Sequence, residues 1–515
     1  MSQLLSLLRR GTPQSSARVA PTDEIVPVHL FDSTTTLRGC ILVWMFRFDE
    51  VLDPDKLHDS LSRVFQRDGW HRLGGRYKRR GDGKLEIHIP RPFTNNRPPV
   101  HFTQEAFSTS LSEHPLASKL PRASDKVQTF PGPRAFNSLA MGPEGASPSN
   151  LDDLVQGDRP QFSLHVSTFT DGTLVGVSHS HMTADLLGFT AVLKAWCLEL
   201  AGRSDEIPPL GGVYEDGMKG LYDPPTQEKH VLAGKELNGW KFGYWALRTL
   251  WESKRAPPES RILCIPKAKM ERLMVQARGE ITRRQDNDNE APTSEACRDP
   301  YFISEGDVLA ALACRLNAQA QAPGSTRSIM TMMALDPRTR APSAFQEGVS
   351  YVGNSPTAVF LECPADKAQE MPLGDLALLS RRSITEQATE EQMKAYSVLC
   401  AESVRSSGDN VLFGDKDMAF QLVSNWLKAS LFDKVDFSPA IVEEASPAEV
   451  RSSDQRKRGH PTYYHSADPG SVEGPYMIHL LVVMGADHDG NVWLSCVLPG
   501  GTWSRLLEYL DGVGE

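Results

Sequence analysis

The chain has 515 residues, enough for at least two domains that each bury a core of their own. Its 55 lysines and arginines against 65 aspartates and glutamates give a net charge of −10, which argues against binding to nucleic acid through the overall field. Hydrophobic residues make up 40% of the chain, so general disorder is excluded. No stretch reaches the roughly 18–20 apolar residues of a membrane-spanning helix, and the sequence predicts no membrane partner.

Eight cysteines are scattered along the chain without a CxxC pair. Several lie in apolar runs, a pattern typical of buried thiols in a reducing compartment rather than of a disulfide framework or a zinc site. The first 22 residues contain three arginines and no acidic residue. We expect a cytoplasmic protein, with a mitochondrial presequence as the alternative explanation of this N-terminal composition.

In the first half, β-branched and aromatic residues predict a strand over Arg38–Phe48. A helix is predicted over Asp53–Phe65, which opens with Asp and Pro. Asp171 and the glycine after it separate two apolar runs, which predicts a β-hairpin, and a helix follows directly. Gly and Pro recur in Pro131–Asn150 and in residues 201–258, so we predict a loop and a long crossover with only short ordered pieces.

The second half begins near Arg261 with a short strand and a helix. The polar segment Thr282–Asp299 is predicted to be a disordered surface insertion. Ser304–Ala318 is predicted to be a helix with a serine cap, and Tyr476–Met484 with Asn491–Leu498 a second hairpin. Strands and helices alternate, which indicates a mixed α/β architecture.

The segment SHSHMTADLLGF contains the residues best suited to chemistry. Strand residues run into His181, and Asp185 follows four positions later. At the junction of a strand and a helix the imidazole can face open space, and a neutral imidazole near pH 7 can take a proton from a hydroxyl or an amine. Asp185 could orient that imidazole or pair with a distant arginine.

Other kinds of site fit the sequence less well. An isolated HxxxD also arises by chance, so it is weak when taken alone. His179 and His181 alternate along the strand, but no further His/Cys cluster completes a metal site, and we predict no metal. The chain has no GxSxG elbow of a serine hydrolase, and no GxGxxG or GxxxxGK[ST] phosphate loop.

The segment around His181 resembles the signature of the BAHD acyl-CoA-dependent acyltransferases, in the fungal branch that includes trichothecene acetyltransferase-like enzymes. His181-Met-Thr-Ala-Asp185-Leu-Leu-Gly188 fits the HxxxDxxG run of that family. Further blocks follow in family order: Ser304-Glu-Gly-Asp307, then Asp336-Pro-Arg338-Thr-Arg340 with Tyr351-Val-Gly353-Asn354, then Ser424-Asn-Trp426 leading to Asp436-Phe437. The resemblance therefore covers nearly the whole chain.

The resemblance implies a mixed α/β fold of two chloramphenicol-acetyltransferase-like domains with a channel between them. It implies His181 as the general base for direct attack of an acceptor hydroxyl on an acyl-CoA thioester. Acetyl-CoA is the expected co-substrate, a fungal secondary metabolite the expected acceptor, and no permanently bound cofactor is expected. Asp185 would pair with an arginine, for which Arg338 is the candidate, and hold His181 in position.

The resemblance also divides the chain. Residues 1–200 are expected to form the half that carries HxxxD, residues 201–258 the crossover, and residues 259–515 the half that carries the family's DFGWG loop. This chain departs from that loop, since Asp436-Phe437 is followed by Ser-Pro-Ala. The loop is expected to shape the CoA side of the channel, and its proline could keep a rigid turn.

Three more residues are candidates for CoA binding: Ser424, Arg456 and Lys457. The two basic residues could meet CoA phosphates, or could belong to a solvated charged loop. Two other hypotheses stay open for the whole chain. One is a free-standing condensation-type domain fed by a carrier protein, although such domains usually show HHxxxDG and here Ser180 and Leu186 flank the motif. The other is a non-catalytic protein that kept the fold. We expect a monomer whose partners are acyl-CoA and a small alcohol.

Overall fold

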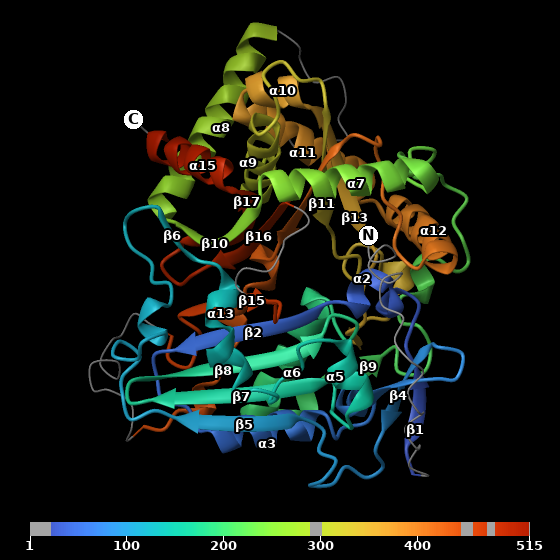
Figure 1. Ribbon diagram of the computed structural model, residues 1–515, viewed down its shortest axis with the longest axis vertical. Coiled ribbons are helices and arrows are strands. Elements are labelled where there is room, and N and C mark those ends of the chain that lie inside the picture. Colours follow the sequence, from blue (N-terminus) through green and yellow to red (C-terminus); the bar gives the residue numbers. More distant parts are fainter. Residues whose placement is uncertain (1–21, 289–300, 444–456, 471–478, 514–515) are drawn as a thin grey trace.

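The computed structural model describes residues 22–288, 301–443, 457–470 and 479–513 of the chain. Two large β-sheets organise it, one in the lower and one in the upper part of Figure 1. The lower sheet has the strand order β15-β2-β8-β7-β5: Tyr463–Ala467, Ile41–Phe48, Gly172–Ser180, Phe162–Phe169 and His101–Ala106. The upper sheet has the order β13-β11-β14-β16-β17-β10-β6: Ala358–Pro364, Ser328–Ala334, Ala419–Asn425, His479–Ala486, Val492–Pro499, Pro258–Ile265 and Gln128–Pro131.

Two small sheets lie beside the large ones. One has the order β1-β4-β3: Glu24–Pro27, Leu85–Ile89 and Arg76–Arg79. The other pairs β9 (Leu210–Gly211) with β12 (Ser350–Tyr351) in parallel, and thereby joins a segment of the crossover to the second half of the sequence.

Helices cover both faces of the lower sheet. The aromatic ring of Phe189, on α6 (Leu186–Leu200), stacks on Trp44 and contacts His179 of β8, and α3 (Pro54–Val64) packs on α6. Gly176 of β8 faces the opposite side, since successive strand residues point to alternate faces. A Cβ there would lie 1.9 Å from the carbonyl oxygen of Ala140 on α4 (Asn137–Met141), so glycine permits the close approach of that helix.

The upper sheet also has two covered faces. Residues Ile329 and Met333 of β11 belong to a core under five helices: α8 (Lys267–Asp288), α9 (Glu305–Gln319), α10 (Ala365–Glu370), α11 (Leu373–Gln387) and α15 (Gly500–Gly512). Met330, on the alternate face of the same strand, belongs to a second core under α7 (Gly239–Arg255) and α12 (Glu390–Ser407). The short helices α2 (Thr35–Arg38), α5 (Leu151–Gln156) and α13 (Leu431–Lys434) complete the fold.

Two strands cross between the sheets. β15 comes late in the chain but pairs with β2 of the lower sheet, where Tyr464 lies opposite Phe46. β6 comes early but pairs with β10 at the edge of the upper sheet. Each large sheet thus contains one strand from the other end of the sequence, and the domain boundaries expected from the sequence stay a prediction.

Most predicted elements are confirmed. The first strand spans Ile41–Phe48, Asp53 caps α3 by accepting from Asp55 and Lys56, and β7–β8 and β16–β17 form antiparallel pairs. The side chain of Asp307 accepts from the backbone N–H of Ser304 at 2.7 Å at the start of α9. None of the helices in the described ranges combines the length and apolar character needed to cross a lipid bilayer.

Three predictions were wrong. The segment Pro131–Asn150 contains α4, whose Leu139 and Ala140 are buried against the sheet. The crossover contains α7, a 17-residue helix held by burial of Trp245 and Ala246 despite its glycines. The polar segment from Thr282 onward continues α8 as far as Asp288, and its remainder at residues 289–299 lies outside the described residues.

Candidate active site

His181 is the first residue after β8, in the turn between that strand and α6. Its backbone N–H donates to the carbonyl oxygen of Cys40 at 2.9 Å, which ties the turn to the segment that enters β2. Asp185 is the N-cap of α6, and its Oδ1 accepts from the backbone N–H of Gly188 at 2.8 Å. The turn is therefore fixed at both ends, with the side chain of His181 half-buried between them.

Gly188 allows the second half of the sequence to reach this turn. A Cβ at this position would lie 2.0 Å from the carbonyl oxygen of Val352. Any larger residue would push residues 351–354 away from the first turn of α6, and those residues carry the contacts described next.

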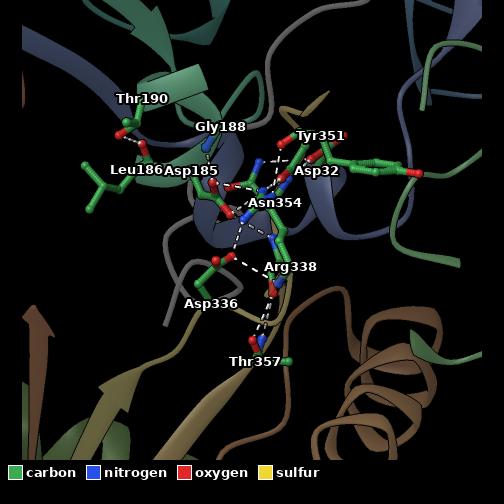
Figure 2. Close-up of polar contacts among 12 residues, drawn as sticks. Asp32, Asp185, Leu186, Gly188, Thr190, Asp336, Arg338, Tyr351, Asn354 and Thr357 are labelled. Atoms are coloured by element: carbon green, nitrogen blue, oxygen red, sulfur yellow. Dashed lines mark hydrogen bonds and ion pairs between the residues drawn. The ribbon is translucent and has the colours of Figure 1, made fainter. Parts of the chain in front are cut away.

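Asp185 and Arg338 form an ion pair across the two halves, with Nη2 lying 3.1 Å from Oδ1 and 3.0 Å from Oδ2 (Figure 2). The backbone N–H of Ser355 also donates to Asp185 Oδ2, at 3.1 Å. The carboxylate of Asp185 therefore points toward the second half of the sequence, where it accepts from a guanidinium and a main-chain amide.

Arg338 binds more than Asp185. Its Nη1 donates to Asp336 at 2.7 Å, its Nε to the carbonyl of Tyr351 at 3.0 Å, and its Nη2 to the carbonyl of Gly353 at 2.6 Å. Burial acts to lower the pKa of Arg338, but the carboxylates of Asp185 and Asp336 outweigh it and raise the pKa above its ordinary value. The guanidinium thus remains charged and holds residues 351–353 next to the histidine turn.

Asn354 fixes the tautomer of the neutral imidazole ring of His181. Its Nδ2 donates to the carbonyl of His181 at 2.8 Å and to Oδ1 of Asp32 at 2.9 Å. The amide oxygen, which can only accept, therefore faces Nδ1 of His181, 2.9 Å away. Nδ1 must carry a hydrogen to make this bond, so in the neutral ring the lone pair lies on Nε2.

Asp32 holds Asn354 in place through two hydrogen bonds. Its Oδ1 accepts from both the backbone N–H of Asn354, at 2.7 Å, and the side-chain amide. The carboxyl of Asp32 is buried, and this burial raises its pKa to about 6, although the hydrogen bonds from Asn354 act in the opposite direction. Because these bonds favour the ionised form, they orient the amide of Asn354 best when Asp32 is charged.

His179 has no free coordination position. The indole N–H of Trp44 donates to its Nε2 at 3.2 Å, and its Nδ1 lies 2.9 Å from the carbonyl of Ser180. Burial lowers the pKa of His179 to about 3, so the ring is neutral and both nitrogens are occupied. Among the described residues, no three His, Cys, Asp or Glu side chains come together as a metal site.

A pocket adjoins the turn, because Met182 and Thr183, which follow His181, line part of it. The hydroxyl of Thr183 lies 2.9 Å from that of Tyr77 and donates to Gln161 at 3.2 Å. The remaining polar side chains of the wall are those of His29, Asp32, Arg72, Asp216, Tyr351 and Asn354. The pocket therefore offers both donors and acceptors beside the turn that carries His181.

Comparison with known proteins identifies the chain's relatives. The model of the Transferase family matches residues 147–449, a range that includes His181, Arg338 and Asn354. The chain belongs to this family, the BAHD acyltransferases. Acetyltransferase adrJ of Penicillium rubens is 34% identical over 98% of this chain and 99% of that protein, and O-acetyltransferase PaAT-2 of Phomopsis amygdali is 32% identical over 96% and 99%. The chain is an acyltransferase.

The same fold occurs in a solved structure. The crystal structure of F. sporotrichioides TRI101 complexed with coenzyme A and T-2 superposes with a TM-score of 0.62 over 94% of this chain and 97% of that one. Sequence identity is 14%, so the likeness concerns the fold alone. The mixed α/β acyltransferase fold predicted from the sequence is confirmed.

Phe437 anchors the loop after α13, the segment predicted from the sequence to correspond to the family's DFGWG loop. Its ring is fully buried. The centroid of this ring lies 5.3 Å from that of Phe48 and 4.6 Å from that of Trp196. Asp436 Oδ1 accepts from the backbone N–H of Ser438 at 2.9 Å, and Ser438–Ala440 form a 3-10 turn. Both residues hold the loop against the first half, and a role toward CoA stays a prediction.

The other residues expected on the CoA side have protein partners. Ser424 Oγ accepts from the indole N–H of Trp426 at 2.8 Å. Lys457 is exposed and donates to Asp433 at 2.8 Å. Arg456 lies outside the described residues. Neither contact brings Ser424 or Lys457 to His181. A part of the three candidates in CoA binding stays a prediction.

The described cysteines are free, five of them buried and two, Cys40 and Cys197, half-buried. Burial raises the pKa of both half-buried thiols to about 12. Cys40 is the one whose carbonyl accepts from His181, but at such a pKa its thiol is not a nucleophile near neutral pH. The eighth cysteine, Cys297, lies outside the described residues.

Sequence analysis missed two residues of this site. Asn354 belongs to the Gly-Asn block that carried the family resemblance. The sequence therefore marked its position but gave no indication that it contacts His181. Asp32 lies in a short 3-10 turn (Phe31–Ser33), and no local pattern distinguishes it from a surface aspartate.

Replacing Arg338 tests how much the two halves depend on its guanidinium. Arg338→Ala leaves the carboxylates of Asp185 and Asp336 without their cation, and we expect the free energy of unfolding to fall by about 3–5 kcal/mol. Arg338→Lys keeps the charge but cannot donate to all four partners, so its loss should be smaller. Urea unfolding measures both. Arg203→Ala, which breaks an exposed pair with Glu206, is the matched control and should change little.

Asp32 makes stability depend on pH. Its pKa is raised from 3.8 to about 6 in the folded state, so ionising it costs folding free energy that accumulates as pH rises between these values and stays constant above them. We expect Asp32→Asn to gain stability relative to the wild type over that window, by up to about 3 kcal/mol. Urea unfolding at a series of pH values measures the difference. If the free energies of unfolding of Asp32→Asn and the wild type differ by the same amount at pH 3.8 and at pH 6, the prediction is wrong.

Proposed function

We propose that this chain transfers an acetyl group from acetyl-CoA to a hydroxyl of a small fungal secondary metabolite, with His181 as the general base. The observation that carries the proposal is the hydrogen bond from Nδ1 of His181 to Asn354, which leaves Nε2 with the lone pair. An imidazole held in this tautomer can accept a proton from a bound alcohol.

The choice of donor and acceptor rests on the relatives. Proteins named acetyltransferase and O-acetyltransferase align with the chain over nearly its full length, and the TRI101 structure of the same fold contains coenzyme A and T-2. These similarities favour acetyl-CoA as co-substrate and a small-molecule alcohol as acceptor. They do not favour a condensation-type domain that takes its acyl group from a carrier protein.

The reaction needs no covalent acyl-enzyme. Nε2 of His181 takes the proton of the acceptor hydroxyl while its oxygen attacks the thioester carbonyl, which gives a tetrahedral intermediate. The intermediate collapses, the carbon–sulfur bond breaks, and the imidazolium returns the proton to the leaving CoA thiolate. The high pKa of the Cys40 thiol supports direct attack over an acyl-cysteine.

Asp185 and Arg338 act as positioning residues in this proposal. The carboxylate of Asp185 caps the helix that follows His181 and pairs with Arg338, so it does not reach the ring itself. Asp436 and Phe437 form the donor-side loop, and Lys457, with Ser424, is the described candidate for contact with CoA. We expect a cytoplasmic monomer with no resident cofactor.

Removal of the imidazole tests the general base. His181→Ala should lower kcat by roughly a hundredfold or more, because it removes the nitrogen that takes the hydroxyl proton. Isothermal titration with acetyl-CoA should give the wild-type Kd, since the base does not bind the donor. His58→Ala, on the outer helix α3, is the control and should keep full activity.

A His181→Ala protein that acetylates at the wild-type rate would contradict the general-base mechanism. A wild-type protein that binds no acyl-CoA would instead favour the non-catalytic hypothesis. The two results are distinct because the first is read from turnover and the second from binding alone.

Asn354 is expected to act through His181. Asn354→Ala removes the acceptor that fixes the Nδ1–H tautomer, so kcat should fall roughly ten- to a hundredfold while KM for acetyl-CoA stays unchanged. Ser355→Ala, on the same segment, keeps its backbone bond to Asp185 and serves as the control. An equal loss in both variants contradicts a specific role for Asn354.

A further inference from the structure

The outer face of α7 is apolar. Nine large hydrophobic side chains are exposed among the described residues, and four of them lie on this one helix. Their exposed fractions are 69% for Trp240, 47% for Tyr244, 59% for Leu247 and 58% for Trp251. We call these four residues the α7 stripe. In Figure 1, α7 runs across the outside of the upper part of the molecule.

The four residues form one continuous row. Their spacing of four, three and four positions places them on the same side of an α-helix. The opposite side already has partners, because Trp245 and Ala246 are buried in the core over β11 and β13, and Trp245 makes an edge contact with Phe420 of β14. The helix is therefore anchored by one apolar side and presents a second one outward.

Positive charge borders the stripe on the helix. Lys241, Lys254 and Arg255 are exposed, and the guanidinium of Arg255 lies 5.3 Å from the ring centroid of Trp251. The acidic residue of the helix, Glu252, is half-buried and bonded to Arg248 and Arg327 at 2.9 Å each.

A nearby loop adds one more cation but no net positive charge. Lys416 lies 5.9 Å from the ring centroid of Tyr244, and it is flanked by the exposed Asp415 and Asp417. The positive character of this surface therefore comes from α7 itself. It contrasts with a chain whose net charge is −10.

We propose that the α7 stripe docks on the anionic surface of a lipid bilayer. Tryptophan and tyrosine combine an apolar ring with a polar N–H or O–H, and they are favoured at the boundary of headgroups and acyl chains. Lysine and arginine beside such a row attract anionic headgroups. A row of this kind on a helix too short to span a membrane is typical of an interfacial helix.

Vesicle binding by the purified full-length protein tests the proposal. Sedimentation is compared between vesicles of phosphatidylcholine alone and vesicles that also contain phosphatidylserine, each at low and high salt. We expect binding to the anionic vesicles, weakening with salt, and a blue shift of tryptophan emission on binding. This readout does not depend on the proposed acetyl transfer.

Two pairs of substitutions separate the two contributions. Trp240→Ser with Trp251→Ser should lower the partition coefficient roughly tenfold or more, since it removes the apolar rings. Lys254→Glu with Arg255→Glu should lower the partition coefficient on anionic vesicles roughly tenfold or more. Ile25→Ser with Val275→Ser removes two exposed apolar residues elsewhere and should bind like the wild type.

Three outcomes overturn the proposal. A wild-type protein that stays in solution with both kinds of vesicle contradicts the proposal directly. Equal binding by the stripe variant and the wild type places the contact elsewhere. A wild-type dimer that the tryptophan substitutions convert to a monomer, measured by light scattering, assigns the stripe to a second copy of the chain. Thermal unfolding confirms that each variant is folded.

Discussion

The guanidinium of Arg338 connects two distant parts of the sequence at the turn that carries His181. It pairs with the carboxylates of Asp185 and Asp336 and donates to the carbonyls of Tyr351 and Gly353. A half-buried cation with four acceptors fixes the direction of each, because leaving any of them unpaired costs free energy. The path of residues 351–355 beside α6 therefore depends on this one side chain.

Two different restraints then act on His181. The ion pair acts on the backbone, through the cap that Asp185 makes on α6, while Asn354 acts on the ring through Nδ1. The first restraint sets where the imidazole lies and the second sets which nitrogen is free. An HxxxD segment without the partner loop would supply the residue but not its tautomer, which explains why the short motif alone is weak.

The sequence predicted elements whose determinants are local. The helix after Asp53, the hairpin around Asp171 and the turn at His181 each depend on a few neighbouring residues. Contacts between remote segments leave no such pattern: Asn354 lies 173 positions from His181 and 322 from Asp32. The helix α7 was missed for another physical reason, since glycines and an apolar row on both sides obscure the amphipathic period.

The late strand β15, which pairs with the early strand β2, has a consequence for folding during synthesis. Its neighbour β2 is complete early in synthesis, yet Thr462, which donates to Arg47, follows 415 positions later. At the usual rates of translation this interval lasts on the order of 20–80 s. During that time β2 is an open sheet edge, the kind of surface on which nascent chains aggregate. We expect the emerging first half to need a chaperone on the ribosome until its last strand arrives.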